Sequence, residues 1–106
     1  MKTKIKTIDV NIYEWFDKTY GNSYFAGLVV INYGLPTAKS FNLPFQYGYG
    51  NHSEHIAFEE LQERGFIPEQ PAHTSFFRYY EENKIIYRYS IQTNCKKRDL
   101  MQFNDK

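Results

Sequence analysis

The stretch Ser23-Tyr24-Phe25-Ala26-Gly27-Leu28-Val29-Val30-Ile31-Asn32 decides the fold. Its second half is apolar at consecutive positions, through Leu28-Val29-Val30-Ile31, rather than at alternate ones. A strand that is apolar on both faces is typical of the interior of a sheet. The chain is therefore expected to fold around a sheet in which this segment is a central strand.

The segment upstream of this stretch, Ile5 to Phe16, has a different periodicity. Ile8, Val10 and Ile12 fall on one face, and polar residues alternate with them. A period of two with β-branched residues indicates a half-buried strand. Between the two strands, the run from Asp17 to Asn22 has the composition of a turn, because Gly and Asn tolerate positive φ. The two strands are predicted to form a hairpin.

A short third strand is predicted downstream. Tyr33-Gly34-Leu35-Pro36 ends the central strand, and Ser40 to Gln46 is extended in character. Pro44 has no amide hydrogen to donate to a neighbouring strand, which favours an edge position for this segment.

A helix is predicted to follow, ending at Arg64. Asn51 and Glu54 have the spacing of a capping box, with Ser53 as an alternative cap, and Gly65 stands where a helix-terminating glycine belongs. An apolar stripe runs along this helix at helical spacing, formed by Ile56, Ala57 and Leu61.

The segment from 74 to 83 allows two interpretations. Thr74 or Ser75 could cap a short helix from Phe76 to Glu82, or the segment could be a strand that pairs with the next one. The end Glu81-Glu82-Asn83 favours the helix, with Asn83 as a residue that tolerates the left-handed conformation.

A last strand, Ile85 to Thr93, completes the predicted fold. Its alternate residues Ile85, Tyr87, Tyr89 and Ile91 share one face. The segment after about residue 95 is polar and expected to be frayed or loop-like. The sequence thus predicts a single α+β domain over residues 1–106. It has a mostly antiparallel three- or four-stranded sheet, covered on one face by one long and one short helix, and a polar C-terminal tail.

Charge and cysteine content narrow the function classes. Thirteen basic and twelve acidic residues give a net charge of +1, which argues against a dedicated duplex-binding protein. The single cysteine, Cys95, forms no internal disulfide, so a reducing cytoplasm is the expected setting. The N-terminal residues lack the apolar core of a secretory signal, and no segment approaches the roughly 20 apolar residues of a membrane span.

Aromatic residues are the most unusual part of the composition, at 19% of the chain. Trp15 is predicted to cluster around the first turn with Tyr13, Tyr20, Tyr24 and the cation Lys18. Such a cluster suits a protein-binding hot spot or base stacking, and equally cross-strand packing.

The loop Tyr47-Gly48-Tyr49-Gly50 offers a similar choice. It is either an aromatic recognition loop or a tight turn whose tyrosines pack on the sheet.

His52, His55 and Glu59 project from one side of the predicted helix. Imidazoles and a carboxylate could bind zinc, but their spacing matches no established metal motif, and Glu63 extends the same side as in an ordinary solvated face. No metal and no cofactor is therefore predicted.

The basic run Lys96-Lys97-Arg98 is either a phosphate contact or a solvated terminus. Cations beside Cys95 could lower the pKa of its thiol, but no base can be placed next to it. The paired carboxylates, Glu59-Glu60 and Glu81-Glu82, are adjacent in sequence and point about 100° apart on a helix, so they form no acid–base pair. The sequence favours a protein that is not an enzyme.

Several motifs resemble those of small uncharacterised proteins encoded by tailed phages. They are Trp15-Phe16-Asp17-Lys18, Gly21-Asn22-Ser23-Tyr24-Phe25, the segment from Leu43 to Gly50, Glu81-Glu82-Asn83 and Lys96-Lys97-Arg98-Asp99-Leu100. The resemblance covers most of the chain and departs from the pattern at Lys84, where a glycine is common. It implies a phage accessory protein in the host cytoplasm, of a kind that often serves host takeover or inhibition of host defences.

The sequence thus predicts a non-enzymatic phage accessory protein that binds and modulates a host protein, with anti-defence inhibition as one form of this activity. The predicted partner-binding residues are Trp15, Lys18, Tyr20, Tyr47, Tyr49, His52 and His55. The alternative is a small nucleic-acid-binding module that stacks bases on sheet aromatics and contacts phosphates through Lys18, Lys96, Lys97 and Arg98. The oligomeric state stays open, and a homodimer is compatible with the sequence.

Overall fold

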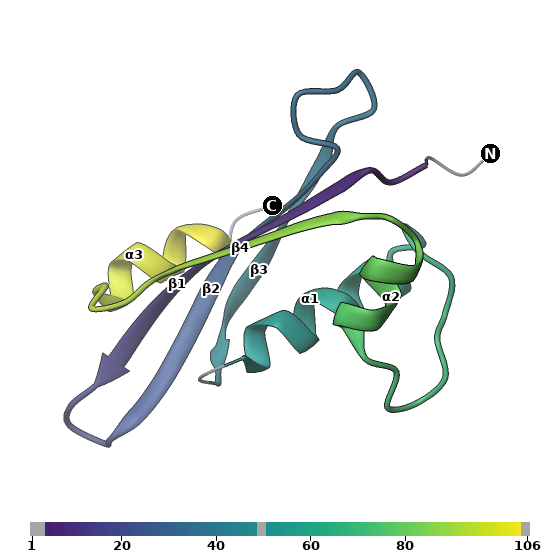
Figure 1. Ribbon diagram of the computed structural model, residues 1–106. Helices are drawn as coiled ribbons and strands as arrows, with labels where there is room; N and C mark the ends of the chain where they lie inside the picture. Colours follow the sequence, from purple (N-terminus) through teal and green to yellow (C-terminus); the bar gives the residue numbers. More distant parts are fainter. Residues whose placement is uncertain (1–3, 49–50, 105–106) are drawn as a thin grey trace.

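The computed structural model describes residues 4–48 and 51–104 (Figure 1). The elements follow in the order β1 (Thr7–Asp17), β2 (Asn22–Ile31), β3 (Lys39–Tyr47), α1 (His52–Glu63), α2 (Phe76–Glu82), β4 (Ile86–Gln92), α3 (Lys97–Met101) and the 3-10 helix η1 (Gln102–Asn104). The prediction of an α+β fold is confirmed.

The four strands form one sheet in the order β3-β2-β1-β4. β1 and β2 form the predicted hairpin, and β3 pairs antiparallel with β2, as an edge strand. β4 runs parallel to β1, so the sheet is mixed. This pairing follows from the connection, because α1 and α2 carry the chain from β3 across one face to the far edge of the sheet.

One face of the sheet packs against α1 and α2. Its strands contribute the alternate apolar residues expected from the sequence, such as Ile8, Val10 and Ile12, which are all buried. Phe58 and Leu61 of α1 and Phe76 of α2 complete this core. Burial of this continuous apolar layer is the main stabilising term of the fold.

The N-terminus of α1 differs from the predicted capping box. Asn51 is the N-cap residue but makes no side-chain capping hydrogen bond. Glu54 turns inward instead, where it is buried and accepts a hydrogen bond from the Tyr87 hydroxyl. Glu54 therefore binds Tyr87 of β4 instead of completing a capping box with Asn51. At the other end Gly65, at φ 81°, ends the helix as predicted.

α2 has the predicted bounds and resolves the choice between helix and strand. Ser75 is the cap, and its Oγ accepts a hydrogen bond of 3.3 Å from the backbone N–H of Arg78. The left-handed residue at the C-terminal end is Lys84, at φ 57°, whereas Asn83 keeps φ at −98°. The prediction for Asn83 was therefore one residue early.

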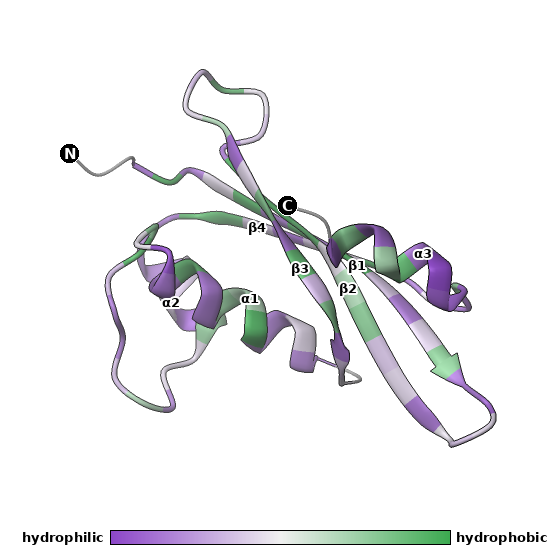
Figure 2. Ribbon diagram, turned by 180° about the vertical axis from the view of Figure 1, so that it is seen from behind, coloured by the Kyte–Doolittle hydropathy of each residue, from purple (hydrophilic) through white to green (hydrophobic). Residues whose placement is uncertain are grey.

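The second face of the sheet carries α3, contrary to the prediction that helices cover only one face. Figure 2, seen from behind, shows α3 lying on the sheet, and it contacts β1, β2 and β3. Leu100 and Cys95 are buried against Ala26 of β2. The tail is thus not loop-like, because these two apolar side chains anchor it despite its polar composition.

The pairing of β3 with β2 contains a bulge. Phe25 is opposite Gln46, but Gly27 is opposite Leu43, so β3 has one residue more than β2 between these pairs. Pro44 lies within this extra length, where a missing amide hydrogen is tolerated. Residues two apart in a regular strand point to the same face of the sheet. Because of the bulge, Phe45 instead packs on the second face, whereas Leu43 is part of the first-face core.

Asn32 fastens the start of β1 to the end of β2. It is fully buried at φ 56°, and its Oδ1 accepts hydrogen bonds from the backbone N–H groups of Lys6 and Thr7. Its Nδ2 donates to the carbonyl of Lys4 and to Thr37 Oγ1. The side chain therefore satisfies backbone groups that have no strand partner there.

Candidate binding surface

A group of aromatic rings lies on the second face of the sheet, toward the β1–β2 turn. It contains Trp15 of β1, Tyr24 of β2, and Phe45 and Tyr47 of β3. Strand register brings them together, because Tyr24 is directly opposite both Trp15 and Tyr47. We call these four residues, with Lys97 of α3, the aromatic surface.

The rings of the aromatic surface contact one another. Tyr24 stacks with Trp15 at a centroid distance of 5.4 Å and with Phe45 at 5.1 Å. Tyr47 meets Tyr24 edge-on at 5.8 Å. Such pairs contribute about 0.5–1.5 kcal/mol beyond area burial. The mutual stacking holds the rings in fixed orientations and already uses part of their faces.

Lys97 adds a positive charge to this group. Its Nζ lies 6.0 Å from the ring centroids of both Trp15 and Phe45. This is the outer limit of a cation–π contact. The ammonium remains exposed while the side chain lies over the rings. The surface therefore combines apolar rings with one accessible cation.

Exposure divides the aromatic surface into a base and a rim. Trp15, Tyr24 and Phe45 are half-buried and pack against the small core under α3. Tyr47, by contrast, has 57% of its surface exposed. Beyond it, in the β1–β2 turn, Tyr20 is 76% exposed. The base packs against the core, whereas the rim side chains are mostly exposed and Tyr47 contacts the base through the edge-on contact with Tyr24.

The predicted partner-binding residues do not form one surface. Trp15 and Tyr47 belong to the aromatic surface, and Lys18 and Tyr20 lie in the adjacent turn. Tyr49 lies outside the described residues. His52 and His55 belong to α1, and their rings meet Phe25 and Phe76 of the first-face core edge-on, at 6.0 and 5.0 Å.

The residues predicted to contact phosphates under the nucleic-acid hypothesis also lie in different parts of the structure. Lys97 is the member of the basic run that reaches the aromatic rings. Lys96 and Arg98 are exposed, and the backbone N–H of Lys96 donates to Asp99 Oδ2 at 2.9 Å, which begins α3. Lys18 is exposed in the β1–β2 turn.

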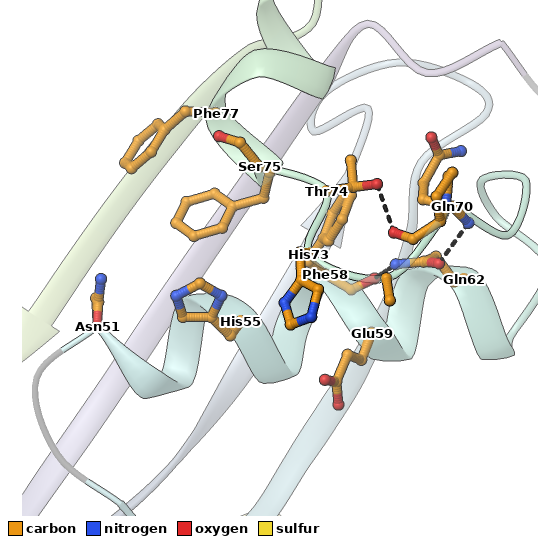
Figure 3. A pocket seen from close by; sticks show the side chains of 13 residues that line it. Asn51, His55, Phe58, Glu59, Gln62, Gln70, His73, Thr74, Ser75 and Phe77 are labelled. Carbon is orange, nitrogen blue, oxygen red and sulfur yellow. Dashed lines mark hydrogen bonds between the residues drawn. The ribbon is translucent and has the colours of Figure 1, made fainter.

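A pocket of about 630 Å³ lies between α1 and the loop that leads to α2. Figure 3 shows His55, His73 and Glu59 facing it from these two segments. His73 takes a left-handed backbone at φ 68°. Within the part of the chain that the structure describes, no group of three or more metal-ligating side chains is arranged to hold an ion.

The pocket also contains hydrogen bonds that hold the loop in place. Gln62 Oε1 accepts a bond of 2.8 Å from the backbone N–H of Gln70. His52, predicted to share a face with His55 and Glu59, does not line the pocket. His73, which the sequence indicates to be a loop residue, lines the pocket from the loop between α1 and α2 and shares no periodicity with the helix.

A partly buried polar cluster joins α1 to β4. The Glu54 carboxylate accepts from Tyr87, and Ser53 Oγ lies 3.1 Å from the Tyr89 hydroxyl. Burial, followed by the hydrogen bond and charge of Glu54, raises the pKa of Tyr87. Burial and the same carboxylate raise the pKa of Tyr80. These tyrosines therefore stay neutral over the physiological range.

Cys95 is not activated by its basic neighbours. The thiol is buried under α3, and this burial raises its pKa. Its Sγ lies 3.3 Å from the carbonyl of Gln92. A raised pKa disfavours the thiolate, which is the reactive form.

Comparison of the chain with models of protein families, with curated proteins and with solved structures finds no match. Within the described residues, no helix combines the length and the apolar character that a membrane span requires. The chemistry of the chain's own surface therefore carries the functional argument.

Proposed function

We propose that this chain is a binding protein rather than an enzyme, and that it attaches to a host protein through the aromatic surface and the adjacent β1–β2 turn. The observation that carries the proposal is the exposure of Tyr47 beside a fixed group of stacked rings, together with the exposure of Tyr20 in the adjacent β1–β2 turn. Tyrosine and tryptophan are the residues most enriched in the energetically dominant positions of protein interfaces.

The arrangement suits a protein partner for a second reason. A preorganised group of rings loses little conformational entropy when it is buried by a partner. The half-buried base formed by Trp15, Tyr24 and Phe45 is already ordered by stacking and by α3. The hydroxyl groups of Tyr20 and Tyr47 can form hydrogen bonds with the partner.

The resemblance to tailed-phage proteins supplies the proposed context. In this context the chain acts in the host cytoplasm as a phage accessory protein, and it modulates its target by steric occlusion. Inhibition of a host defence protein is one form of this activity.

A pull-down from host lysate, with and without nuclease, tests the proposal. Tagged wild-type chain is expected to retain one host protein that resists nuclease and to lose it when Tyr20 and Tyr47 are both replaced by Ala. Tyr33→Ala is the matched control, because Tyr33 is also highly exposed but lies in the β2–β3 loop at the opposite end of the molecule. Equal capture by both variants would contradict the proposal.

Single-stranded nucleic acid is a second candidate ligand, favoured by the position of Lys97 over Trp15 and Phe45. The same surface would then stack bases and contact a phosphate. We regard it as second because the rings already stack on one another and the net charge is only +1. Affinity for an oligonucleotide should fall steeply with salt under this alternative, and binding that is absent or independent of salt would eliminate it.

A further inference from the structure

The two edges of the sheet differ in how they are protected. At the β3 edge, Pro44 lacks an amide hydrogen and the bulge distorts the strand. The backbone N–H of Phe45 is occupied by Asn104 Oδ1 at 2.8 Å, which comes from η1. These are features that prevent a further strand from adding to an edge.

Within the residues that the structure describes, the β4 edge shows none of these features. Its sequence, Ile-Tyr-Arg-Tyr-Ser-Ile-Gln from Ile86 to Gln92, contains no proline, and its register with β1 is continuous. Arg88 is its single charged residue, and its guanidinium is bound to Asp9 of β1, at 2.6 and 3.0 Å. A regular, weakly charged edge strand is a template for pairing with another strand.

We propose that two copies of this chain dimerise by antiparallel pairing of their β4 strands, centred on Tyr89. The resulting sheet would be continuous through both copies. This inference does not rest on the proposed function, because the aromatic surface extends over β1, β2 and β3 and stays free in such a dimer.

Backbone geometry selects the residues that pair. The N–H of Ile86 donates inward, to the carbonyl of Lys6. Because backbone groups of successive strand residues point to opposite sides, Tyr87, Tyr89 and Ile91 turn their N–H and C=O groups outward. When Tyr89 of one copy is opposite Tyr89 of the other, Tyr87 of each copy is opposite Ile91 of the other copy. The residues whose backbone groups point outward therefore pair with one another across the dimer.

Side chains support the same register. Phe77 of α2 is 58% exposed, and its ring meets Tyr87 edge-on at 5.9 Å. Ile91 is 41% exposed on the same face of the sheet. The register places Ile91 of the second copy beside Tyr87 and Phe77, where these exposed apolar groups cover one another. No like charges are brought into opposition, since Arg88 falls opposite Ser90.

A pair of charge variants tests both the dimer and its register. Ile86 is 59% exposed on the other face, and Gln92, also exposed, is its cross-strand partner in the dimer. Ile86→Lys with Gln92→Lys places like charges opposite each other twice, whereas Ile86→Lys with Gln92→Glu places unlike charges there. Within one monomer the two positions are at opposite ends of β4, so the variants change the monomer similarly.

Analytical ultracentrifugation over a concentration series measures the result, with far-UV circular dichroism as the check of folding. We expect a concentration-dependent dimer for the wild type. The Lys–Lys variant should dimerise about tenfold or more weakly than the Lys–Glu variant. A wild type that stays monomeric at all concentrations would overturn the proposal and leave the edge for a strand of another protein. Equal dimerisation of the two variants would also overturn it, because the dimer would then use another surface.

Discussion

Replacement of Leu100 by Ala tests the role of α3 beneath the aromatic surface. Leu100 is fully buried between α3 and the sheet. The three carbon atoms removed correspond to about 2.4 kcal/mol of transfer free energy, at about 0.8 kcal/mol each. A cavity that relaxes incompletely raises the expected loss to about 3 kcal/mol.

The effect should also be visible locally. α3 has five residues and η1 three, so this segment is far too short to be helical without its contacts with the sheet. Trp15 is the single tryptophan of the chain and packs against the small core that Leu100 completes. Its fluorescence therefore reports on α3, and we expect its emission to shift to the red in the variant.

Thermal denaturation followed by circular dichroism and by Trp15 fluorescence measures both effects. At about 4 °C per kcal/mol for a domain of this size, the midpoint should fall by about 12 °C. Met101→Ala is the matched control, because Met101 is the next residue and is 40% exposed. Its effect should remain within about 0.5 kcal/mol. Equal midpoints and equal emission for the two variants would refute the assignment of Leu100 as the anchor of α3.

Three further predictions concern the sheet and the partly buried polar cluster. Gly27→Ala should prevent stable folding, because a Cβ there would lie 2.2 Å from the carbonyl oxygen of Asn11 in β1. Soluble protein with unchanged circular dichroism would contradict this. Asn32→Ala should cost about 3 kcal/mol in denaturant unfolding, since it removes the hydrogen bonds that hold the start of β1; a loss below about 1 kcal/mol would show that water replaces them. Stability should also fall as the pH rises above about 10, because the folded state keeps Tyr80 and Tyr87 protonated while the unfolded chain releases their protons. Tyr87→Phe should reduce this alkaline loss relative to the wild type, and an unchanged pH slope would contradict the cause assigned here.

Periodicity was sufficient to predict most strands and both larger helices. The alternation of Ile8, Val10 and Ile12 and the apolar run in β2 directly reflect burial, which dominates the free energy of folding. Ser75 and Gly65 marked helix ends because local hydrogen bonds and backbone conformation determine them. These features depend on neighbours in the sequence.

Features that depend on distant segments were not predictable in this way. Glu54 has the spacing of a capping residue, yet Tyr87 supplies a buried hydrogen bond that no local pattern encodes. The parallel pairing of β4 depends on the route of the chain over α1 and α2. α3 was missed because its two anchors, Cys95 and Leu100, are separated by four charged residues, so the segment shows no apolar periodicity.

The sequence predicted only some of the residues of the aromatic surface. Trp15, Tyr20 and Tyr24 were expected to cluster around the first turn, whereas Tyr47 was assigned to a separate loop. Phe45 was not expected in this cluster, because the bulge at Pro44 changes the face on which it lies. A proline within a predicted edge strand is a signal that could have indicated such a change. Lys97 reaches the rings only because α3 docks on the second face.

The most direct test of the central claim is the affinity of the captured host protein for purified variants, measured by titration calorimetry. The account predicts that Tyr20→Ala with Tyr47→Ala weakens binding by at least about tenfold at an almost unchanged melting temperature, whereas Tyr33→Ala binds as the wild type does. Wild-type affinity in the double variant would contradict the claim that the aromatic surface and its adjacent turn form the binding site.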